Sequence, residues 1–337
     1  MSSSPRPIEA DALGTAAVAV LPTAGQRTAA VLGLGAALPP TAVASDAIAA
    51  RIGKAPGWIE RRTGIETRRH LQPGETMTAL AAGAAVAALD DAGVASDELD
   101  AIVVATTQGD DLLPNLAPQV AAAIGARNAG ACDVGAACAG FVAGLPMAAA
   151  LIETGRADRV LLVGADALSR FLDHDDPVTA ALFGDGAGAI VLGPSDGDGH
   201  IGPVLVRSDG DQGHIVGIPG HRGPIAMDGH ATFLGAVNQL SATTAEVVAR
   251  AGLTLDDVDL FVYHQANRRI LHGIAERLGI GTDRVVDAIA HAGNTSAASL
   301  PLALHAARRD GRLRPGSRVL LGAVGSGFTW GAGLVTW

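Results

Sequence analysis

Two stretches of this chain align with each other along the sequence at one fixed offset of 159 residues. Ala-Gly-Val at 92–94, followed by Asp-Glu-Leu-Asp-Ala-Ile-Val at 97–103, returns as Ala-Gly-Leu at 251–253 and Asp-Asp-Val-Asp-Leu-Phe-Val at 256–262. Arg-Val-Leu-Leu at 159–162 returns unchanged at 318–321. A register shared over some 70 residues indicates an internally duplicated protein of two similar halves.

The duplication also brings chemically capable residues to equivalent positions. At the same offset, each residue with a reactive or polar side chain in one half is equivalent to an alanine or glycine in the other half. This arrangement predicts that the capable residues converge around a pseudo-two-fold axis. The pairs are Cys138 with Ala297, Asn294 with Gly135, and His264 with Ala105.

The length and composition limit the number of domains and the cellular location that we expect for the chain. Its 337 residues can hold two domains with a large buried core, at 27–195 and 196–337. Residues 1–26 lack a basic start leading into an apolar core, so we expect a flexible N-terminal extension rather than a secretory signal. The longest apolar runs are too short or too broken by Gly to span a bilayer, and we expect a soluble cytoplasmic protein.

Charge and cysteine content argue against nucleic-acid-binding, disulfide-rich and metal-binding proteins. The net charge is −10, and no stripe of Lys and Arg is available to neutralise phosphates, which argues against nucleic acid as a partner. Two cysteines six residues apart argue against a disulfide framework. Nothing matches metal-ligand spacing, so we expect no bound metal.

Short β-rich runs alternate with helical patterns, which predicts βαβ units and mainly parallel sheets covered on both faces. The helix after Cys138 is apolar nearly all round, and its equivalent after Ala297 is rich in Ala and Leu, so both should lie at the centre. Two central helices between two sheets give a duplicated five-layer α-β-α-β-α fold, with a kink at Pro146. The predicted strands are 102–107, 160–164, 189–192, 260–263 and 319–324, and the predicted helices are 76–91, 139–154, 233–251, 268–278 and 296–309.

Cys138 stands where a predicted strand runs into the first central helix. The positive end of a helix dipole and its unpaired N–H groups stabilise a thiolate, and small neighbours leave room for a substrate. Cys138 is therefore a candidate nucleophile, with about the same weight for a core cysteine that packs as a small apolar residue. We interpret Cys132, in the preceding strand pattern, as such a core cysteine.

His264 ends a predicted strand, where ligands collect in α/β sheets, and Asn294 lies in the loop before the second central helix. Taken singly, such a His is more often a satisfied polar residue and such an Asn a helix cap. Together with Cys138 they form a nucleophile and two hydrogen-bond donors. His264 could accept a thiol proton, and His264 with Asn294 could hold an oxyanion.

At this point the chain resembles the β-ketoacyl-acyl-carrier-protein synthase III family of the thiolase superfamily, from about Val31 to the C-terminus. Five motifs in the family's order carry the resemblance, and as a set they are very specific. They are Trp58-Ile-Glu-Arg-Arg-Thr-Gly-Ile65, Gly135-Ala-Ala-Cys138-Ala-Gly-Phe141, Phe183-Gly-Asp-Gly-Ala-Gly188, His264-Gln-Ala-Asn267 and Gly293-Asn-Thr-Ser-Ala-Ala-Ser299.

The resemblance implies a thiolase-like fold, a homodimer and a ping-pong reaction without metal or redox cofactor. Cys138 would take an acyl group from acyl-CoA, and decarboxylative condensation with malonyl-acyl carrier protein would give 3-oxoacyl-carrier protein, in fatty acid or polyketide starter biosynthesis. His264 and Asn294 would stabilise the enolate, and the backbone N–H groups of Cys138 and Ser326 the tetrahedral oxyanion. The resemblance also implies a phosphopantetheine tunnel that passes Phe233, Ala266 and Asn267, with Trp58 and Arg62 at the mouth of the tunnel. Arg269 would contact the carrier protein. Leu113 would close the acyl pocket across the dimer interface.

The chain departs from the family pattern in three places. Pro177 replaces an arginine that helps to hold the CoA adenine against Trp58, which leaves the acyl donor open between CoA and carrier protein. Leu113 replaces a phenylalanine of acetyl-specific enzymes, which predicts a branched or longer starter group. Leu234 and Glu276 replace basic residues that aid carrier-protein docking, and Arg268 and Arg277 are the candidates to compensate.

Two other functions remain open on this fold. A non-condensing acyltransferase would move the acyl group from Cys138 to an alcohol or amine, but such an enzyme needs no enolate stabiliser, and both His264 and Asn294 are retained. A catalytically silent partner subunit is disfavoured because the nucleophile is intact. The sequence therefore predicts a decarboxylating condensing enzyme.

Overall fold

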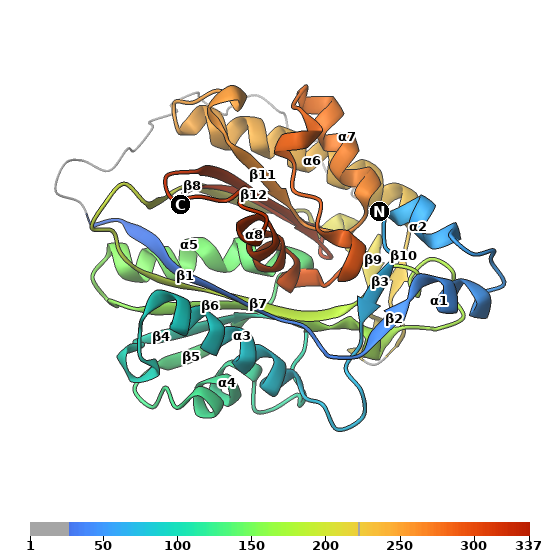
Figure 1. Cartoon of the computed structure of the whole chain (residues 1–337), viewed down its shortest axis with the longest axis horizontal. Coiled ribbons are helices and arrows are strands. Elements are labelled where there is room, and N and C mark those ends of the chain that lie inside the picture. Colours follow the sequence, from blue (N-terminus) through green and yellow to red (C-terminus); the bar gives the residue numbers. More distant parts are fainter. Residues whose placement is uncertain (1–26, 222) are drawn as a thin grey trace, which may run out of the picture.

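Residues 27–221 and 223–337 are described in the computed structural model (Figure 1). The extension predicted at 1–26 lies outside these residues. The strands gather into two large sheets that face each other across a pair of helices.

The first sheet has the strand order β1-β7-β6-β4-β5, and all its strands come from the first half of the chain. The apolar runs that predict strands form β4, β6 and β7, which are almost wholly buried. β5 is the edge strand and is only partly covered. The bounds are β1 Ala29–Ala37, β4 Ala101–Ala105, β5 Gly130–Val134, β6 Val160–Ala167 and β7 Asp185–Pro194.

The second sheet has the order β11-β12-β13-β8 and is built from the second half. Two short ribbons accompany the large sheets, β2 paired with β3 and β9 paired with β10. The bounds are β2 Ala42–Ala44, β3 Thr67–Arg69, β8 His200–Ser208, β9 Val216–Gly217, β10 Ala226–Met227, β11 Leu260–Tyr263, β12 Arg318–Gly325 and β13 Thr329–Thr336.

The helices complete five layers. In Figure 1, α5 and α8 lie between the two sheets, α3 and α4 cover the outer face of the first sheet, and α6 and α7 cover the outer face of the second. The largest apolar core fills the space around α5 and α8, and the predicted α-β-α-β-α architecture is confirmed. The bounds are α1 Ser45–Arg51, α2 Trp58–Thr63, α3 Met77–Ala92, α4 Leu116–Ile124, α5 Gly140–Glu153, α6 Gly229–Arg250, α7 Arg268–Leu278 and α8 Ser299–Arg309.

The duplication is visible in the pairing of the strands. In the first half β4 runs parallel to β6, with Ala101 opposite Val160. In the second half β11 runs parallel to β12, with Leu260 opposite Val319. Each residue of the second pair is 159 positions after its counterpart in the first, so the sequence offset preserves the sheet register.

The expectation of mainly parallel sheets is wrong. The pairs β4/β5, β4/β6 and β11/β12 are parallel, whereas β1/β7, β6/β7, β12/β13 and β8/β13 are antiparallel. The reason is clearest after β12, where residues 326–328 connect directly to β13. A parallel neighbour needs a crossover of a dozen or more residues, so this connection can only form a hairpin.

The predicted elements agree with the structure most closely in the second half. Strand 260–263 and helix 268–278 match β11 and α7 residue for residue. Strand 189–192 grows to the ten residues of β7. α5 continues through Pro146, and the kink predicted there stays a prediction.

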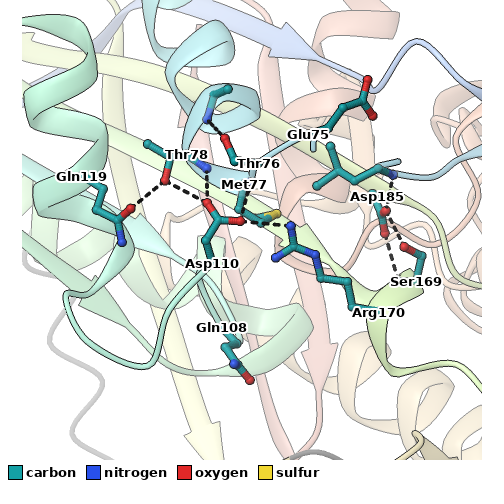
Figure 2. A network of polar contacts seen from close by, with 12 residues as sticks. Glu75, Thr76, Met77, Thr78, Gln108, Asp110, Gln119, Ser169, Arg170 and Asp185 are labelled. Carbon is teal, nitrogen blue, oxygen red and sulfur yellow. Dashed lines mark hydrogen bonds and ion pairs between the residues drawn. The ribbon is translucent and has the colours of Figure 1, made fainter. Parts of the chain in front are cut away.

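A polar network fixes the loop that carries Leu113 (Figure 2). The carboxylate of Asp110 accepts the backbone N–H groups of Met77 and Thr78 at the start of α3, at 2.8 and 2.9 Å. It also pairs with the guanidinium of Arg170 at 3.0 Å. Burial alone would raise the pKa of Asp110, but these hydrogen bonds lower it below its ordinary value. The base of the loop is therefore held by an ionised, well-bonded carboxylate.

Candidate active site

A cavity of about 1070 Å³ opens between the two halves. It is lined by residues that follow strands and precede helices in both halves, as expected for the ends of duplicated α/β elements. The lining includes most of the residues singled out from the sequence, namely Trp58, Arg62, Cys138, Phe233, His264, Ala266, Asn267, Arg269, Asn294 and Ser326.

Cys138 lies in a 3₁₀ turn, Ala137–Ala139, directly before α5. Its sulfur accepts a hydrogen bond from the hydroxyl of Ser296 at 3.3 Å. Burial raises the pKa of the Cys138 thiol to about 12, with a further contribution from the nearby Asp166 carboxylate. Burial thus opposes the thiolate that the helix end is expected to favour. The thiol needs a base and a hydrogen-bond donor to react.

His264 directly follows β11 and is almost fully buried. Its Nδ1 lies 2.6 Å from the hydroxyl oxygen of Ser299, on the first turn of α8. Burial lowers the pKa of His264 to about 4, so the imidazole is neutral near pH 7. Because the hydroxyl can donate to Nδ1 or accept from it, Nε2 can serve as either acceptor or donor.

Asn294 is held from both its backbone and its side chain. Its N–H donates to the carbonyl of Leu182 at 2.9 Å, and its carbonyl accepts the N–H of Gly184 at 2.9 Å. The side-chain oxygen accepts the backbone N–H of Ser296 at 3.0 Å. With Oδ1 occupied in this way, the amide NH₂ group remains as the donor toward the cavity that Asn294 lines.

The loop between β12 and β13 packs against the turn that holds Cys138. A Cβ atom on Gly325 would lie 2.8 Å from the amide nitrogen of Cys138, so only glycine permits this approach. The next residue, Ser326, donates its hydroxyl to the carbonyl of Val216 in β9. The backbone of this loop and the N–H of Cys138 thus border the same end of the cavity.

Two stretches of the chain match known family models. Residues 132–210 match 3-oxoacyl-[acyl-carrier-protein (ACP)] synthase III, and residues 248–337 match the C-terminal model of the same name. The β-ketoacyl-[acyl-carrier-protein] synthase III 2 of Streptomyces coelicolor is 44% identical over 316 residues, covering 93% of this chain and 95% of the relative. The chain belongs to the 3-oxoacyl-[acyl-carrier-protein] synthase III family.

Further relatives and solved structures agree with this family. The β-ketoacyl-[acyl-carrier-protein] synthase III of Rhodospirillum rubrum is 45% identical over 317 residues, covering 90% of this chain and 98% of the relative. The crystal structure of the Aquifex aeolicus synthase III superposes with a TM-score of 0.89 at 36% identity, covering 92% of this chain and all of that one. A priming β-ketosynthase from a polyketide biosynthetic pathway superposes with a TM-score of 0.87 at 36% identity, covering 94% of this chain and 98% of that one. The thiolase-like fold and the class of condensing acyltransferase predicted from the sequence are confirmed.

At the cavity mouth of this synthase III family member, aromatic and cationic side chains meet. The guanidinium of Arg62 lies 4.7 Å from the centre of the Trp58 ring, and the ammonium of Lys54 lies 5.5 Å from it. Phe233 and Pro177 also line the cavity, and Pro177 is exposed. Trp58 therefore has cationic partners from its own helix α2 and the loop before it, which Pro177 cannot supply.

The surface beside the mouth is mixed in character. Arg269 and Arg277 are exposed on α7, as is Glu276. Arg268 is engaged in an ion pair with Asp287, so it is less available to compensate for lost basic residues than Arg277. Leu234, 45% exposed on α6, adds an apolar element.

Leu113 does not line the cavity of its own chain. Its side chain is 77% exposed, and that of its neighbour Leu112 is 79% exposed. Its predicted role in a partner's pocket stays a prediction. Cys132 is exposed on the edge strand β5, so its interpretation as a core cysteine is wrong for the described chain. β5 is at the end of its sheet, where the faces of the sheet are only partly covered, and this leaves Cys132 exposed.

Sequence reasoning missed three residues that hold this site together. Ser296 and Ser299 lie within a motif quoted for the family, but nothing in their spacing shows that they contact Cys138 and His264. Asp166 is the single charged residue in the buried strand β6, a signal that could have been noticed. Its carboxylate accepts the N–H groups of Thr107 and Ala297 at 2.7 and 3.1 Å, bridging the two halves.

No three His, Cys, Asp or Glu side chains in residues 27–221 and 223–337 come together as ligands for a metal ion. Among the helices of the same residues, none has the length and apolar character to cross a membrane.

Proposed function

We propose that this chain transfers an acyl group from an acyl-CoA to Cys138 and then condenses it with malonyl-acyl carrier protein to give a 3-oxoacyl-carrier protein. The observation that carries this proposal is that a single cavity is lined by Cys138, His264 and Asn294. These are a nucleophile, a neutral imidazole and an amide donor. Membership of the synthase III family supports the same reaction.

The first half-reaction loads the enzyme. Neutral His264 accepts the thiol proton of Cys138, and the thiolate attacks the carbonyl carbon of the acyl-CoA. The oxygen of the tetrahedral intermediate takes its hydrogen bonds from the backbone N–H groups of Cys138 and Ser326. The intermediate collapses with cleavage of the bond to the CoA sulfur, and free CoA leaves with the proton. The acyl group remains on Cys138 as a thioester.

The second half-reaction forms the carbon–carbon bond. The bond from the malonyl carboxylate to its neighbouring carbon breaks, CO₂ leaves, and the electron pair forms a thioester enolate. Its oxygen accepts hydrogen bonds from Nε2 of His264 and the amide of Asn294. The carbanion then attacks the acyl carbonyl, the Cys138 thiolate leaves, and it takes up one proton from the solvent to restore the thiol. Every step uses side chains or backbone N–H groups of this chain, and none of them requires a metal or redox cofactor.

Substrate delivery follows from the shape of the cavity. The phosphopantetheine arm would run past Phe233, Ala266 and Asn267 to reach Cys138, because these residues line the same cavity as Cys138. Trp58 and Arg62 would contact the nucleotide of CoA, and exposed Arg269 would meet the acidic carrier protein. Pro177 offers no charge to the CoA adenine or phosphates. Acyl thioesters of both CoA and acyl carrier protein should therefore be tested as acyl donors.

We further propose a homodimer. The edge strand β5 has unpaired backbone groups on one side and an exposed Cys132, a surface that another strand can cover. The loop beside it presents Leu112 and Leu113, both more than three quarters exposed, on a base fixed by Asp110. Light scattering after gel filtration tests this assembly: a monomer at micromolar concentration would contradict it.

The decisive experiment weighs the intact protein after incubation with a panel of acyl-CoAs and acyl-carrier proteins. The expected result is an acyl adduct on Cys138 that disappears when malonyl-carrier protein is added, with release of CO₂ and formation of 3-oxoacyl-carrier protein. Cys138→Ser should form no adduct, because a serine hydroxyl is far from ionised at neutral pH. An equal adduct on the serine variant would remove Cys138 from the role of nucleophile.

The same experiment separates the rival activity. A non-condensing acyltransferase would load Cys138 but release no CO₂ from malonyl-carrier protein, and the adduct would disappear only with an alcohol or amine acceptor. The presence of both His264 and Asn294 in the cavity favours condensation, because only an enolate needs both donors.

A further inference from the structure

The closest polar contact of the Cys138 sulfur comes from the other half of the chain. The hydroxyl of Ser296 donates a hydrogen bond to Sγ at 3.3 Å. Ser296 is 1% exposed and belongs to the 3₁₀ turn Ser296–Ala298 that leads into α8. This turn is the equivalent, at the offset of 159 residues, of the turn that holds Cys138 itself.

The backbone of Ser296 is held in an unusual conformation that aims its hydroxyl. Its φ is 51°, in the left-handed region that residues other than glycine seldom occupy. Its N–H donates to Oδ1 of Asn294, and the next N–H, of Ala297, donates to the carboxylate of Asp166 at 3.1 Å. Both neighbours are buried, so the turn is fixed on each side.

The surroundings of the sulfur otherwise oppose a negative charge. Burial and the Asp166 carboxylate on β6 both raise the pKa of the thiol, whereas the hydrogen bond from Ser296 lowers it. His264, at the end of β11, is neutral at pH 7 and brings no positive charge. Burial raises the pKa of the Asp166 carboxyl, and the Ser296 hydroxyl, which lies within hydrogen-bonding reach of it, opposes that rise. Among these groups, the serine is the side chain that donates to the sulfur.

We propose that Ser296 is a further catalytic residue, whose hydroxyl stabilises the thiolate of Cys138 by direct hydrogen bonding. The inference rests on the proposed function of Cys138 as nucleophile. Ser296 keeps its own proton throughout: the thiol proton moves to His264, and the serine hydroxyl donates to the resulting sulfur anion. Once the sulfur carries the acyl group it is a poor acceptor, and the hydroxyl is free to turn to Asp166.

The test measures alkylation of Cys138 by iodoacetamide, which reacts with the thiolate and needs no acyl donor. Cys132→Ala serves as the parent, so that whole-protein mass reports on Cys138 alone. Ser296→Ala should fold, because Ala137 adopts the same backbone at the equivalent position with φ of 46°. Ser296→Gly relieves the left-handed backbone and also removes the hydroxyl. Ser241→Ala is the matched control, since it removes a buried hydroxyl that has no hydrogen-bond partner in the described chain.

Both Ser296 variants should alkylate about tenfold to a hundredfold more slowly than the parent at pH 8, with the midpoint of the pH profile moved upward, because they lose a hydrogen bond to a charged group. The Ser241 variant should react at the parental rate. Unchanged rates and midpoints in both Ser296 variants would overturn the proposal. The proposal would also be overturned if Ser296→Ala alkylates slowly while Ser296→Gly alkylates at the parental rate. Both variants lack the hydroxyl, so the backbone would then be responsible for the slow rate. Failure of the parent to accept any acyl group would count against the proposed function alone.

Discussion

Ala137 and Ser296, which stand 159 residues apart, share a left-handed backbone with φ of 46° and 51°. They are the two non-glycine residues of the described chain with positive φ. Each directly precedes a residue of the pseudo-symmetric pair Cys138 and Ala297, at the start of a central helix. The duplication has therefore preserved a strained turn twice, once to present the nucleophile and once to direct a hydroxyl at it.

The strain at Ala137 predicts opposite effects on stability and activity. A left-handed backbone costs an alanine roughly 1–2 kcal/mol that glycine does not pay, whereas glycine adds about 0.4–1 kcal/mol of unfolded-state entropy. Ala137→Gly should thus leave the free energy of unfolding unchanged or raise it by up to about 1.6 kcal/mol. Acyl loading should fall by about tenfold, because the turn no longer fixes the position of the sulfur. Urea unfolding and intact-mass loading measure the two quantities.

The matched control is Ala95→Gly, at an exposed alanine with an ordinary extended backbone of φ −76° and ψ 148°. No strain is relieved there, so this variant should lose about 0.5–1 kcal/mol of stability. If both glycine variants destabilise the protein equally, the turn at Ala137 stores no strain.

The division of labour between the half-reactions predicts unequal losses at His264 and Asn294. Removal of one oxyanion donor typically costs 10²–10³ in rate. Asn294→Ala should lose malonyl decarboxylation by roughly this factor and lose acyl loading much less. His264→Ala should lose both half-reactions, because His264 also accepts the thiol proton of Cys138 during loading. Decarboxylation is followed by release of labelled CO₂, and loading by intact mass. Small and equal effects on both half-reactions would contradict the assignment of the two side chains to the enolate.

The buried imidazole predicts a pH dependence of stability. Burial lowers the pKa of His264 to about 4, below the unfolded value of 6.5. A lowered folded-state pKa gives stability that is fully present above pH 6.5 and is lost as the pH falls toward 4. The loss from this one group is on the order of 3 kcal/mol over that range. His264→Gln carries no titrating ring, so its free energy of unfolding should fall less between pH 7 and pH 4. The free energies of unfolding of both proteins are measured by urea unfolding at several pH values in this range. If both fall by the same amount between pH 7 and pH 4, His264 is not buried in its neutral form.

Local pattern was enough to predict part of the fold. β11 matches its predicted range because it is a short apolar run. α7 matches because its apolar residues recur at helical spacing between clear ends: Asn267 caps its start through the N–H of Arg269 at 3.0 Å, and Gly279 ends it with positive φ. The glycine-rich strands β1 and β13 were missed, since their sequences carry no strong alternation. Strand polarity was mispredicted because pairing depends on contacts far apart in the chain.

Some residues of the candidate site could likewise be predicted from the sequence, and others could not. Cys138, His264 and Asn294 could be found because each is a chemically capable residue at the end of a predicted element. The role of Ser296 could not, because it depends on a backbone angle and on contact between the two halves. The raised pKa of Cys138 was also missed, because the sequence shows the helix end but not how the protein around this partly exposed residue disfavours its charged form.

Selectivity for the acyl group yields the last prediction, at Leu113. This side chain is 77% exposed and lies outside the cavity of its own chain, on a loop whose base is fixed by Asp110. If it forms the floor of the partner's acyl pocket in the proposed homodimer, Leu113→Phe should contract that pocket. Forcing extra volume into a packed site costs about 1–3 kcal/mol, which corresponds to roughly tenfold to a hundredfold in rate.

Loading of isobutyryl and hexanoyl groups should fall by that factor in Leu113→Phe, while acetyl loading is kept, because the acetyl group does not reach the added ring. Leu112→Phe is the matched control: it is 79% exposed on the same loop and has no predicted role in the pocket. Acyl-enzyme formation is measured by intact mass with acetyl, isobutyryl and hexanoyl donors for all three proteins. If the ratio between donors stays the same in Leu113→Phe, the residue only packs in the interface, and the acyl pocket must be closed by other side chains.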